Sequence, residues 1–386
     1  MDAIKTYAMP ILRYGFGILK WSQQELRKMD TKTRSILTKF GFHHPKSCTQ
    51  RLYVSRKFSG RGLNSVVDCY RQENTAMAKY LVANKLNDPL VDIVRRVEAA
   101  KCYGIMAYSH SPRRGNAKDI NIERYDLMLK KKLHGDYQSK QHNNINVDPT
   151  LSYDWIRTSH LRPETESLIC AAQEQTLATK YVRTKIWKTS SDANCRLCKE
   201  SPETIHHIVS GCKMLAGTQY TYRHNQVAKY LHWCVLRDIG VSVPETWTQH
   251  TPAPTVSTND ITVLWDLPII TDKKVKANRP DITIHDRKNR ECIFVDVSIP
   301  VCENIVKKEA EKLTKYRDLE IETQKCWNLK KVRTIPIVVG ALGAVCKNLP
   351  KYIKAVTPRA KFCTLQKTAL LGTAHFIRNF LTPIND

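Results

Sequence analysis

Residues 279–297 read RPDITIHDRKNRECIFVDV, and this sequence is the most informative one about the structure of the C-terminal part of the chain. Two β-rich runs, Ile282–Ile284 and Cys292–Val297, flank the polar segment Asp286–Arg290. Runs of this kind around a short polar segment predict a β-hairpin. Strand and helix patterns alternate further along the chain, which predicts an α/β arrangement for residues 261–386.

The hairpin brings two acidic residues together. A turn centred on Lys288 and Asn289 places Asp281 directly opposite Asp296 and on the same face of the sheet, because both are equally far from the turn. Their Cβ atoms are then expected about 4.5–5.5 Å apart. Two carboxylates this close repel each other unless a cation lies between them, and Mg²⁺ prefers oxygen ligands. We therefore predict a catalytic Mg²⁺ site held by Asp281 and Asp296.

A helical pattern at 303–327 follows the hairpin and carries the candidate catalytic lysines, Lys312 and Lys315. A lysine ammonium near a bound metal stabilises the negative charge that develops on an attacked phosphate. Either lysine fits this role, and the sequence leaves the choice between them open.

A second metal site is predicted upstream of the hairpin. The segment from Cys195 to Cys212 has the form C-x2-C-x8-H-x4-C, with Cys198 and His207 as its middle ligands. Zinc binds four thiolate or imidazole ligands in a tetrahedron, and a site with no open position is structural. We therefore predict a structural Zn²⁺ bound by this knuckle, with His206 as the alternative to His207.

The chain is strongly basic. Its 386 residues include 62 Lys and Arg against 36 Asp and Glu, which gives a formal net charge of +26. Such an excess attracts polyanions, so nucleic acid is the expected partner. The 13 cysteines without a secretory signal indicate a reducing compartment. The longest apolar stretch, Ile335–Val345, is too short for the roughly 20 residues that span a bilayer, so no membrane partner is expected.

The N-terminal half shows helical patterns. Ser22 and Glu25 form a capping box at the start of a helix that ends near Gly41. A second helix is predicted over 63–86, and a third over 162–187. Between them, residues 113–150 are polar and weakly periodic, which indicates an exposed connector containing one helix.

These patterns predict an α+β multidomain protein. We expect a helical N-terminal region at 1–110, a basic helical linker at 111–190, a zinc knuckle with its following helix at 191–240, and the α/β domain at 261–386.

The order of these motifs resembles the C-terminal part of the Pol polyprotein, the reverse transcriptase, of site-specific non-LTR (type-1) retrotransposable elements. The matching stretches are ETIHHIVSGC (203–212), YRHN (222–225), WDLPI (265–269), NRPDI (278–282), VDVSIP (295–300), KKEAEKLTKYRDLEIE (307–322) and VVGALG (338–343). The N-terminal stretch LRYGFGILKW (12–21) is similar to the thumb and linker region of the same proteins.

The resemblance implies a restriction-like endonuclease of the PD-(D/E)xK superfamily. Such an enzyme nicks a DNA target so that the new 3′ end primes reverse transcription of the element RNA, which implies DNA and RNA partners in the nucleus. By motif, Asp281 and Asp296 are the metal-binding acids. Ser298 stands where the standard lysine is found, which is compatible with a lysine displaced to the helix, Lys312 or Lys315.

One departure from the family leaves an alternative open. The chain contains no Asp-Asp pair, so the polymerase palm is absent and polymerisation is not expected. Two functions follow from this: a nickase that lacks the palm, or a catalytically inactive nucleic-acid-binding remnant or domesticated module.

Overall fold

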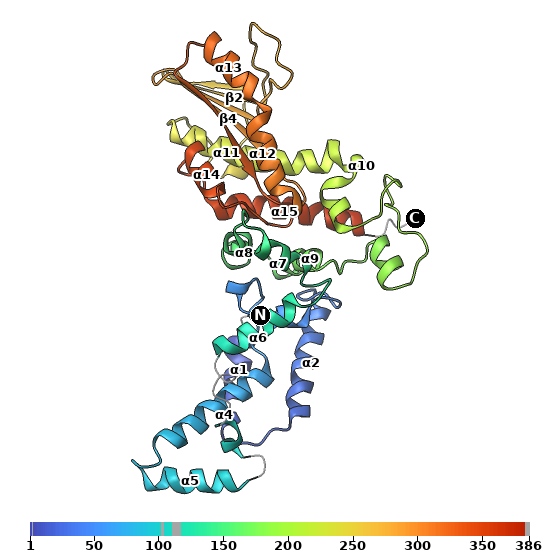
Figure 1. Cartoon of the computed structure of the whole chain (residues 1–386), viewed down its shortest axis with the longest axis vertical. Coiled ribbons are helices and arrows are strands. Elements are labelled where there is room, and N and C mark those ends of the chain that lie inside the picture. The colour runs from blue at the N-terminus through green and yellow to red at the C-terminus, as the bar shows by residue number, and fades with distance from the viewer. Residues whose placement is uncertain (2, 102–103, 110–116, 383–386) are drawn as a thin grey trace. The chain divides into compact units, whose positions relative to one another are not determined.

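The computed structural model describes residues 1, 3–101, 104–109 and 117–382. The chain divides into two compact units, an N-terminal unit (Met1–Asp136) and a C-terminal unit (Tyr137–Asp386), which run from blue to cyan and from green to red in Figure 1. Together they give a mixed α+β protein. Residues 111–116 of the predicted linker lie outside the described residues. None of the helices described is both long enough and apolar enough to cross a membrane.

The N-terminal unit is helical. Its α-helices are α1 (Met9–Phe16), α2 (Gln23–Lys39), α3 (Thr49–Tyr53), α4 (Val66–Ala83), α5 (Pro89–Ala100) and α6 (Ala117–Leu129).

The predicted start of α2 is confirmed. The Ser22 hydroxyl accepts a hydrogen bond from the Glu25 backbone N–H (3.2 Å), and the Glu25 carboxylate accepts one from the Ser22 N–H (2.8 Å). This reciprocal pair satisfies two backbone donors that the helix leaves unpaired. The second predicted helix is also found, as α4, which begins after Ser65.

The C-terminal unit combines helices with a sheet. Its α-helices are α7 (Asp136–Asn143), α8 (Pro149–Thr158), α9 (Pro163–Gln173), α10 (Lys213–Leu215), α11 (Thr221–Asp238), α12 (Ile305–Lys315), α13 (Arg317–Cys326), α14 (Leu349–Val356) and α15 (Phe362–Leu381). Its strands are β1 (Thr255–Ser257), β2 (Ile261–Trp265), β3 (Ile282–Asp286), β4 (Glu291–Ser298) and β5 (Lys331–Val338).

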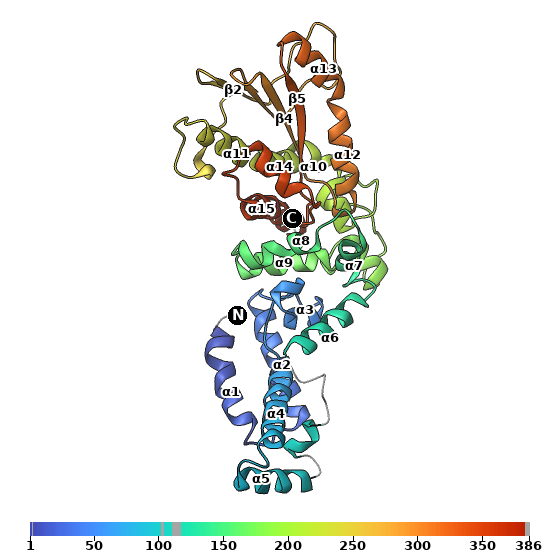
Figure 2. The same cartoon turned by 60° about the vertical axis from the view of Figure 1, so that its left-hand side comes forward.

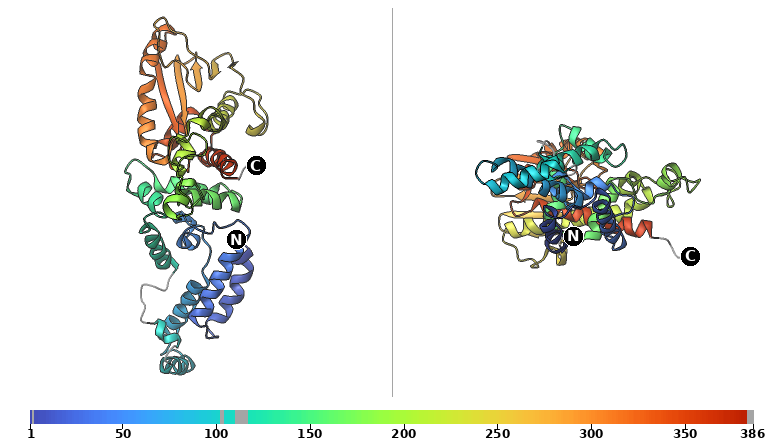
Figure 3. Two further views of the ribbon diagram at one scale, coloured as in Figure 1. Left: turned by 90° about the vertical axis from the view of Figure 1, so that its right-hand side faces the viewer. Right: turned by 90° about the horizontal axis from the view of Figure 1, so that it is seen from below.

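The described strands form one sheet in the order β1-β2-β3-β4-β5. Neighbouring strands are antiparallel except for β4 and β5, which are parallel. Parallel neighbours need a crossover connection, and α12 with α13 supplies it. Figures 2 and 3 show α12 running alongside the strands of this sheet. Through this crossover, the helix with the candidate lysines packs against the sheet.

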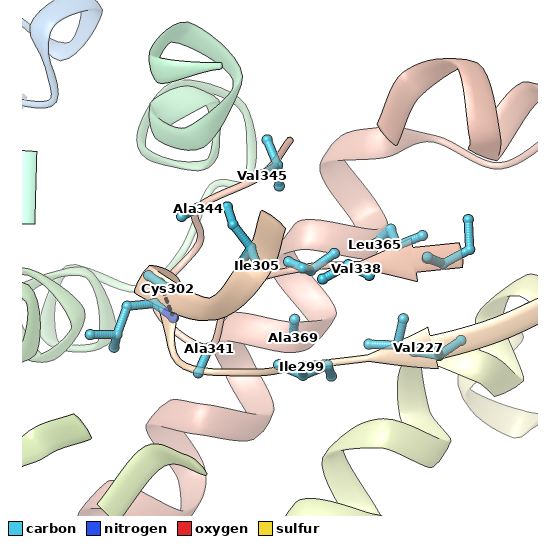
Figure 4. Close-up of a cluster of buried hydrophobic side chains, with 14 of the residues drawn as sticks. Val227, Ile299, Cys302, Ile305, Val338, Ala341, Ala344, Val345, Leu365 and Ala369 are labelled. Atoms are coloured by element: carbon cyan, nitrogen blue, oxygen red, sulfur yellow. Dashed lines mark hydrogen bonds between the residues drawn. The ribbon is translucent and has the colours of Figure 1, made fainter. Parts of the chain in front are cut away.

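One buried core joins the sheet to the helices that follow and precede it. Figure 4 shows its centre, where Val227 of α11, Ile305 of α12, Val338 of β5 and Leu365 of α15 meet. The same cluster contains Cys195 of the predicted knuckle. The knuckle and the sheet are therefore held in place by the same packing.

Two helix predictions are wrong in their extent. The pattern at 303–327 forms two helices rather than one, because α12 ends at Lys315 and is followed by Tyr316, whose side chain is buried with Phe294. The pattern at 162–187 is also interrupted: α9 stops at Gln173, and Gln175 takes a left-handed backbone conformation with φ of 55°.

The predicted connector at 113–150 contains more helix than expected. Both α6 and α7 fall within it, and α8 begins at its end. The sequence of this stretch is polar and shows little apolar periodicity, because α6 buries only Ile120 and Met128. Hydrophobic periodicity therefore did not predict these helices. Residues 241–260, which lie between the predicted knuckle and the predicted α/β domain, contain the edge strand β1.

Candidate active site and metal centre

The hairpin of β3 and β4 has the predicted register. Ile282 pairs with Val295 and Asp286 pairs with Glu291 across a four-residue turn. Asp281 comes one residue before the first of these pairs. Extending the same pairing by one residue places Asp281 opposite Asp296. The Asp281 carboxylate accepts a hydrogen bond from the backbone N–H of Val297 (2.6 Å). This bond holds the carboxylate beside the end of β4.

Asp296 is buried, with 1% of its surface exposed, and it contacts both candidate lysines. The Lys312 ammonium lies 2.6 Å from Oδ1, and the Lys315 ammonium lies 2.9 Å from Oδ2. Burial by itself raises the pKa of this carboxyl, but the two ammonium groups outweigh it and bring the pKa below its ordinary value. Asp296 is therefore ionised at neutral pH.

Asp281 has a partner that sequence reasoning missed. His224 of α11 places its Nε2 atom 3.2 Å from Asp281 Oδ1. Burial acts to lower the pKa of this imidazole, while the carboxylates of Asp281 and Asp296 raise it above its ordinary value. The one available signal was its place in the YRHN stretch, which by itself assigns no role to the histidine.

These residues line one cleft of about 670 Å³. Asp281 and Asp296 come from the sheet, Lys308, Lys312 and Lys315 from α12, His224 and Asn225 from α11, and His206 and Ser210 from the knuckle region. Ser298 also lines the cleft but offers no charge. The structure thus places both predicted acids and both predicted lysines in one cavity, with cationic groups around the acids.

The four predicted zinc ligands also come together. The ligand atoms of Cys195, Cys198, His207 and Cys212 all lie within 4.8 Å of one another. The Sγ atoms of Cys195 and Cys212 are 3.9 Å apart. A tetrahedron with Zn–S bonds of about 2.3 Å has edges of about 3.8 Å. The cluster can therefore hold a metal such as zinc.

Local hydrogen bonds shape this knuckle. The Cys195 N–H donates to the carbonyl of Ser201 (2.8 Å), which closes the turn carrying the first two cysteines. The Tyr220 hydroxyl donates to the Ile208 carbonyl (2.7 Å) and accepts from the Cys212 N–H (3.1 Å). These bonds position the segment with the last two ligands.

The structure decides between the two histidines. His207 Nε2 lies 3.3 Å from the Cys198 sulfur, inside the cluster. His206 Nε2 instead lies 3.3 Å from a carboxylate oxygen of Glu303. His207 is the one grouped with the cysteines, and His206 lines the cleft.

Arg223 connects the knuckle to the cleft. Its guanidinium is almost fully buried and donates to the carbonyls of Val209, within the knuckle, and Ile299, just after β4 (3.0 Å each). It also donates to the Thr373 hydroxyl of α15 (2.9 Å). A displaced knuckle would therefore disturb the end of the strand that carries Asp296.

Within the described residues, the cysteine–histidine cluster is the only group of three or more Cys, His, Asp or Glu with ligand atoms this close together. Asp281 and Asp296 thus have no third side chain of these types at metal-ligand spacing. When the sequence is compared with models of protein families and with curated proteins, nothing matches.

Proposed function

We propose that the C-terminal unit is a metal-dependent DNA endonuclease of the PD-(D/E)xK type. In this proposal the chain is part of the Pol protein of a site-specific non-LTR retrotransposon, and it nicks target DNA in the nucleus to prime reverse transcription of the element RNA. One observation carries the proposal: Asp281 and Asp296 line a single cleft, with Lys312 and Lys315 both on Asp296.

The donor set suits Mg²⁺. The ion is commonly held in proteins by one or two carboxylates, with water and substrate phosphate as the other ligands. Asp281 and Asp296 would hold it, and the cleft leaves room for a phosphate. When bound, Mg²⁺ supplies a Lewis acid for the phosphoryl oxygen and a water of lowered pKa.

The surrounding side chains have distinct tasks. The ammonium groups of Lys312 and Lys315 now balance the Asp296 charge, and a divalent cation would compete with them for the same oxygens. A lysine released in this way can stabilise the charge that develops on the phosphate. His224 and the Val297 N–H hold the Asp281 carboxylate in its orientation.

The zinc site is structural in this proposal. Three cysteines and a histidine fill the four positions of a tetrahedron and leave none open for a substrate. Its contribution is to shape the wall of the cleft, since His206, Ser210 and Gly211 all line it.

A second candidate function is a DNA- or RNA-binding module without turnover. The net charge of +26 supports binding by itself, and both oxygens of Asp296 already have lysine partners. The two functions differ in one measurement, in which the purified chain is incubated with supercoiled plasmid with and without Mg²⁺. A nuclease converts the plasmid to open circles only with the metal, whereas a binding module retards it and leaves it closed.

The two lysines are expected to differ in importance. Lys312 is less exposed than Lys315 (15% against 36% of the side chain), and the Lys315 ammonium also donates to the Tyr316 hydroxyl. We therefore expect Lys312→Ala to slow Mg²⁺-dependent nicking by about 100-fold, typical of a lost electrostatic contact in a catalytic site, and Lys315→Ala to slow it less. Nicking rates on plasmid measure both effects.

Lys307 provides the matched control for this comparison. It lies on the same helix, is exposed, and does not line the cleft. Lys307→Ala should nick at the parent rate. A Lys312→Ala protein that nicks as fast as the parent would show that this lysine is not catalytic.

A further inference from the structure

A polar groove of about 500 Å³ lies in the N-terminal unit, and none of its lining residues belongs to the proposed nuclease. One wall is a stripe of α2 at helical spacing, and the other is the loop that leads into α3. Its lining residues are Thr31, Arg34, Ser35, Thr38, Lys39, His43, Pro45, Ser47 and Thr49. The lining therefore combines hydroxyl groups and basic side chains with no carboxylate.

The opposite face of α2 explains how the groove stays free of acids. Leu26, Asp30 and Leu37 are buried on that face. The Asp30 carboxylate accepts hydrogen bonds from the Ser65 hydroxyl (2.6 Å) and the Val66 N–H (2.8 Å). The acid next to Thr31 in sequence is thus directed into the protein, and the groove keeps its positive charge.

The basic groups of the groove are available to an anion. The Arg34 guanidinium donates to the hydroxyls of Tyr53 (3.0 Å) and Thr31 (2.9 Å), so neutral oxygens hold it in place and none of its described contacts is a carboxylate. Lys39 is exposed and forms no ion pair with the described residues. An arginine fixed in this way loses little side-chain entropy when it binds a phosphate.

One buried polar group at the groove lacks a partner. The Ser47 hydroxyl is buried and forms no hydrogen bond with any described residue. His43, also at the groove, is only 7% exposed. Buried polar groups in folded proteins are nearly always hydrogen-bonded, so unpaired ones point to a missing partner.

We propose that this groove binds the phosphodiester backbone of a nucleic-acid strand. Arginine, lysine, serine and threonine are the side chains that most often contact nucleic-acid phosphates. The eight helical residues from Thr31 to Thr38 span about 10 Å along the helix axis, close to three nucleotides of one strand at about 3.4 Å each. The site goes beyond the proposed nuclease, because it lies in the other unit and needs no metal.

His43 contributes a neutral donor. Burial is the main cause that lowers the pKa of its imidazole to about 4, and the charges of Arg61, His44 and Arg34 add to the effect. The ring is thus uncharged at pH 7 and can donate one N–H to a phosphate oxygen. The groove then holds a strand through two positive charges and several neutral donors.

The test compares the full chain with an Arg34→Gln/Lys39→Gln variant in binding a fluorescent 20-nucleotide RNA and DNA of the same sequence. Without added divalent cations, nicking does not interfere with the measurement. We expect affinity to fall about 10- to 100-fold at fixed salt, as for two lost hydrogen bonds of ordinary net strength. The salt dependence, the slope of log Kd against log salt, should fall by about 1.4 for single strands. The ratio of the RNA and DNA affinities identifies the preferred strand.

Two further variants make the result decisive. Arg27→Gln/Lys32→Gln removes the same charge from exposed positions of α2 that do not line the groove, and it should change affinity by less than twofold. Ser35→Ala/Thr38→Ala keeps the charge and removes two donors, and it should weaken binding about three- to tenfold. Equal losses in the two charge variants, or unchanged affinity after the hydroxyl change, would overturn the groove assignment.

Discussion

The Asp281→Asn and Asp296→Asn variants should each lose Mg²⁺-dependent nicking by about 1,000-fold. A bound metal contributes several kcal/mol of transition-state stabilisation, and each factor of ten in rate corresponds to about 1.4 kcal/mol. Asparagine keeps the size of the side chain and one oxygen, so the bond from the Val297 N–H to residue 281 can be retained. The change therefore removes charge with little change in shape.

The two variants should differ in stability. Asp281 is partly exposed, with 20% of its side chain accessible, and its variant should unfold close to the parent temperature. Asp296 is buried beneath two lysines, and its variant leaves the Lys312 ammonium, 15% exposed, without its carboxylate. Leaving a buried charge unpaired costs several kcal/mol. Rates should therefore be measured below the unfolding temperature of each variant.

Asp266 is the matched control. It lines the same cleft, but its side chain is half exposed and forms an ion pair with Arg279. Asp266→Asn should nick within a few-fold of the parent and bind DNA equally well. If the Asp281/Asp296 double variant nicked as fast as the Asp266 variant, the metal-dependent nuclease proposal would be wrong.

Local signals explain why some of this arrangement was predictable. The hairpin register follows from the alternation and the turn at Lys288 and Asn289, because both depend on neighbouring residues. The capping box of Ser22 and Glu25 and the spacing of the zinc ligands are also local. Each of these predictions uses contacts within about twenty residues.

The features that were missed depend on long-range packing. The break after Lys315 exists because the Tyr316 ring is buried against Phe294 of the sheet and its hydroxyl donates to the Arg279 carbonyl (3.0 Å). Helical periodicity continues through this position, so the sequence pattern does not predict the break between the two helices. The contact between His224 and Asp281 joins residues on separate elements, and no pattern in either segment predicts it.

Loss of zinc should unfold the knuckle and destabilise the whole C-terminal unit. Cys195 and Cys212 are buried in the same core as the sheet, so the ligand cluster cannot open without exposing that core. Zinc contributes about 10–16 kcal/mol to the folding of isolated finger peptides. If half of the lower of these values applies here, the loss of about 5 kcal/mol lowers the unfolding temperature of a unit of this size by about 10–20 °C.

The experiment removes zinc in two ways: with a chelator, and through Cys195→Ser and Cys198→Ser. Circular dichroism follows unfolding, and elemental analysis of the purified proteins reports bound zinc. Cys195→Ser should have the larger effect, because Cys195 is fully buried while Cys198 is half-buried. Cys363→Ser is the control, since this half-buried cysteine of α15 lies outside the ligand cluster.

The same proteins test whether the knuckle supports the cleft. Arg223 donates hydrogen bonds to the carbonyl of Val209 in the knuckle and to that of Ile299 just after β4. A disordered knuckle should therefore disturb the strand that carries Asp296. We therefore expect zinc loss to lower both DNA affinity and Mg²⁺-dependent nicking. Mg²⁺ is added back to the chelated protein before nicking is measured. Unchanged circular dichroism and DNA affinity in Cys198→Ser would contradict a structural zinc site, because a folded apo knuckle would show that the metal is not needed to hold this wall of the cleft.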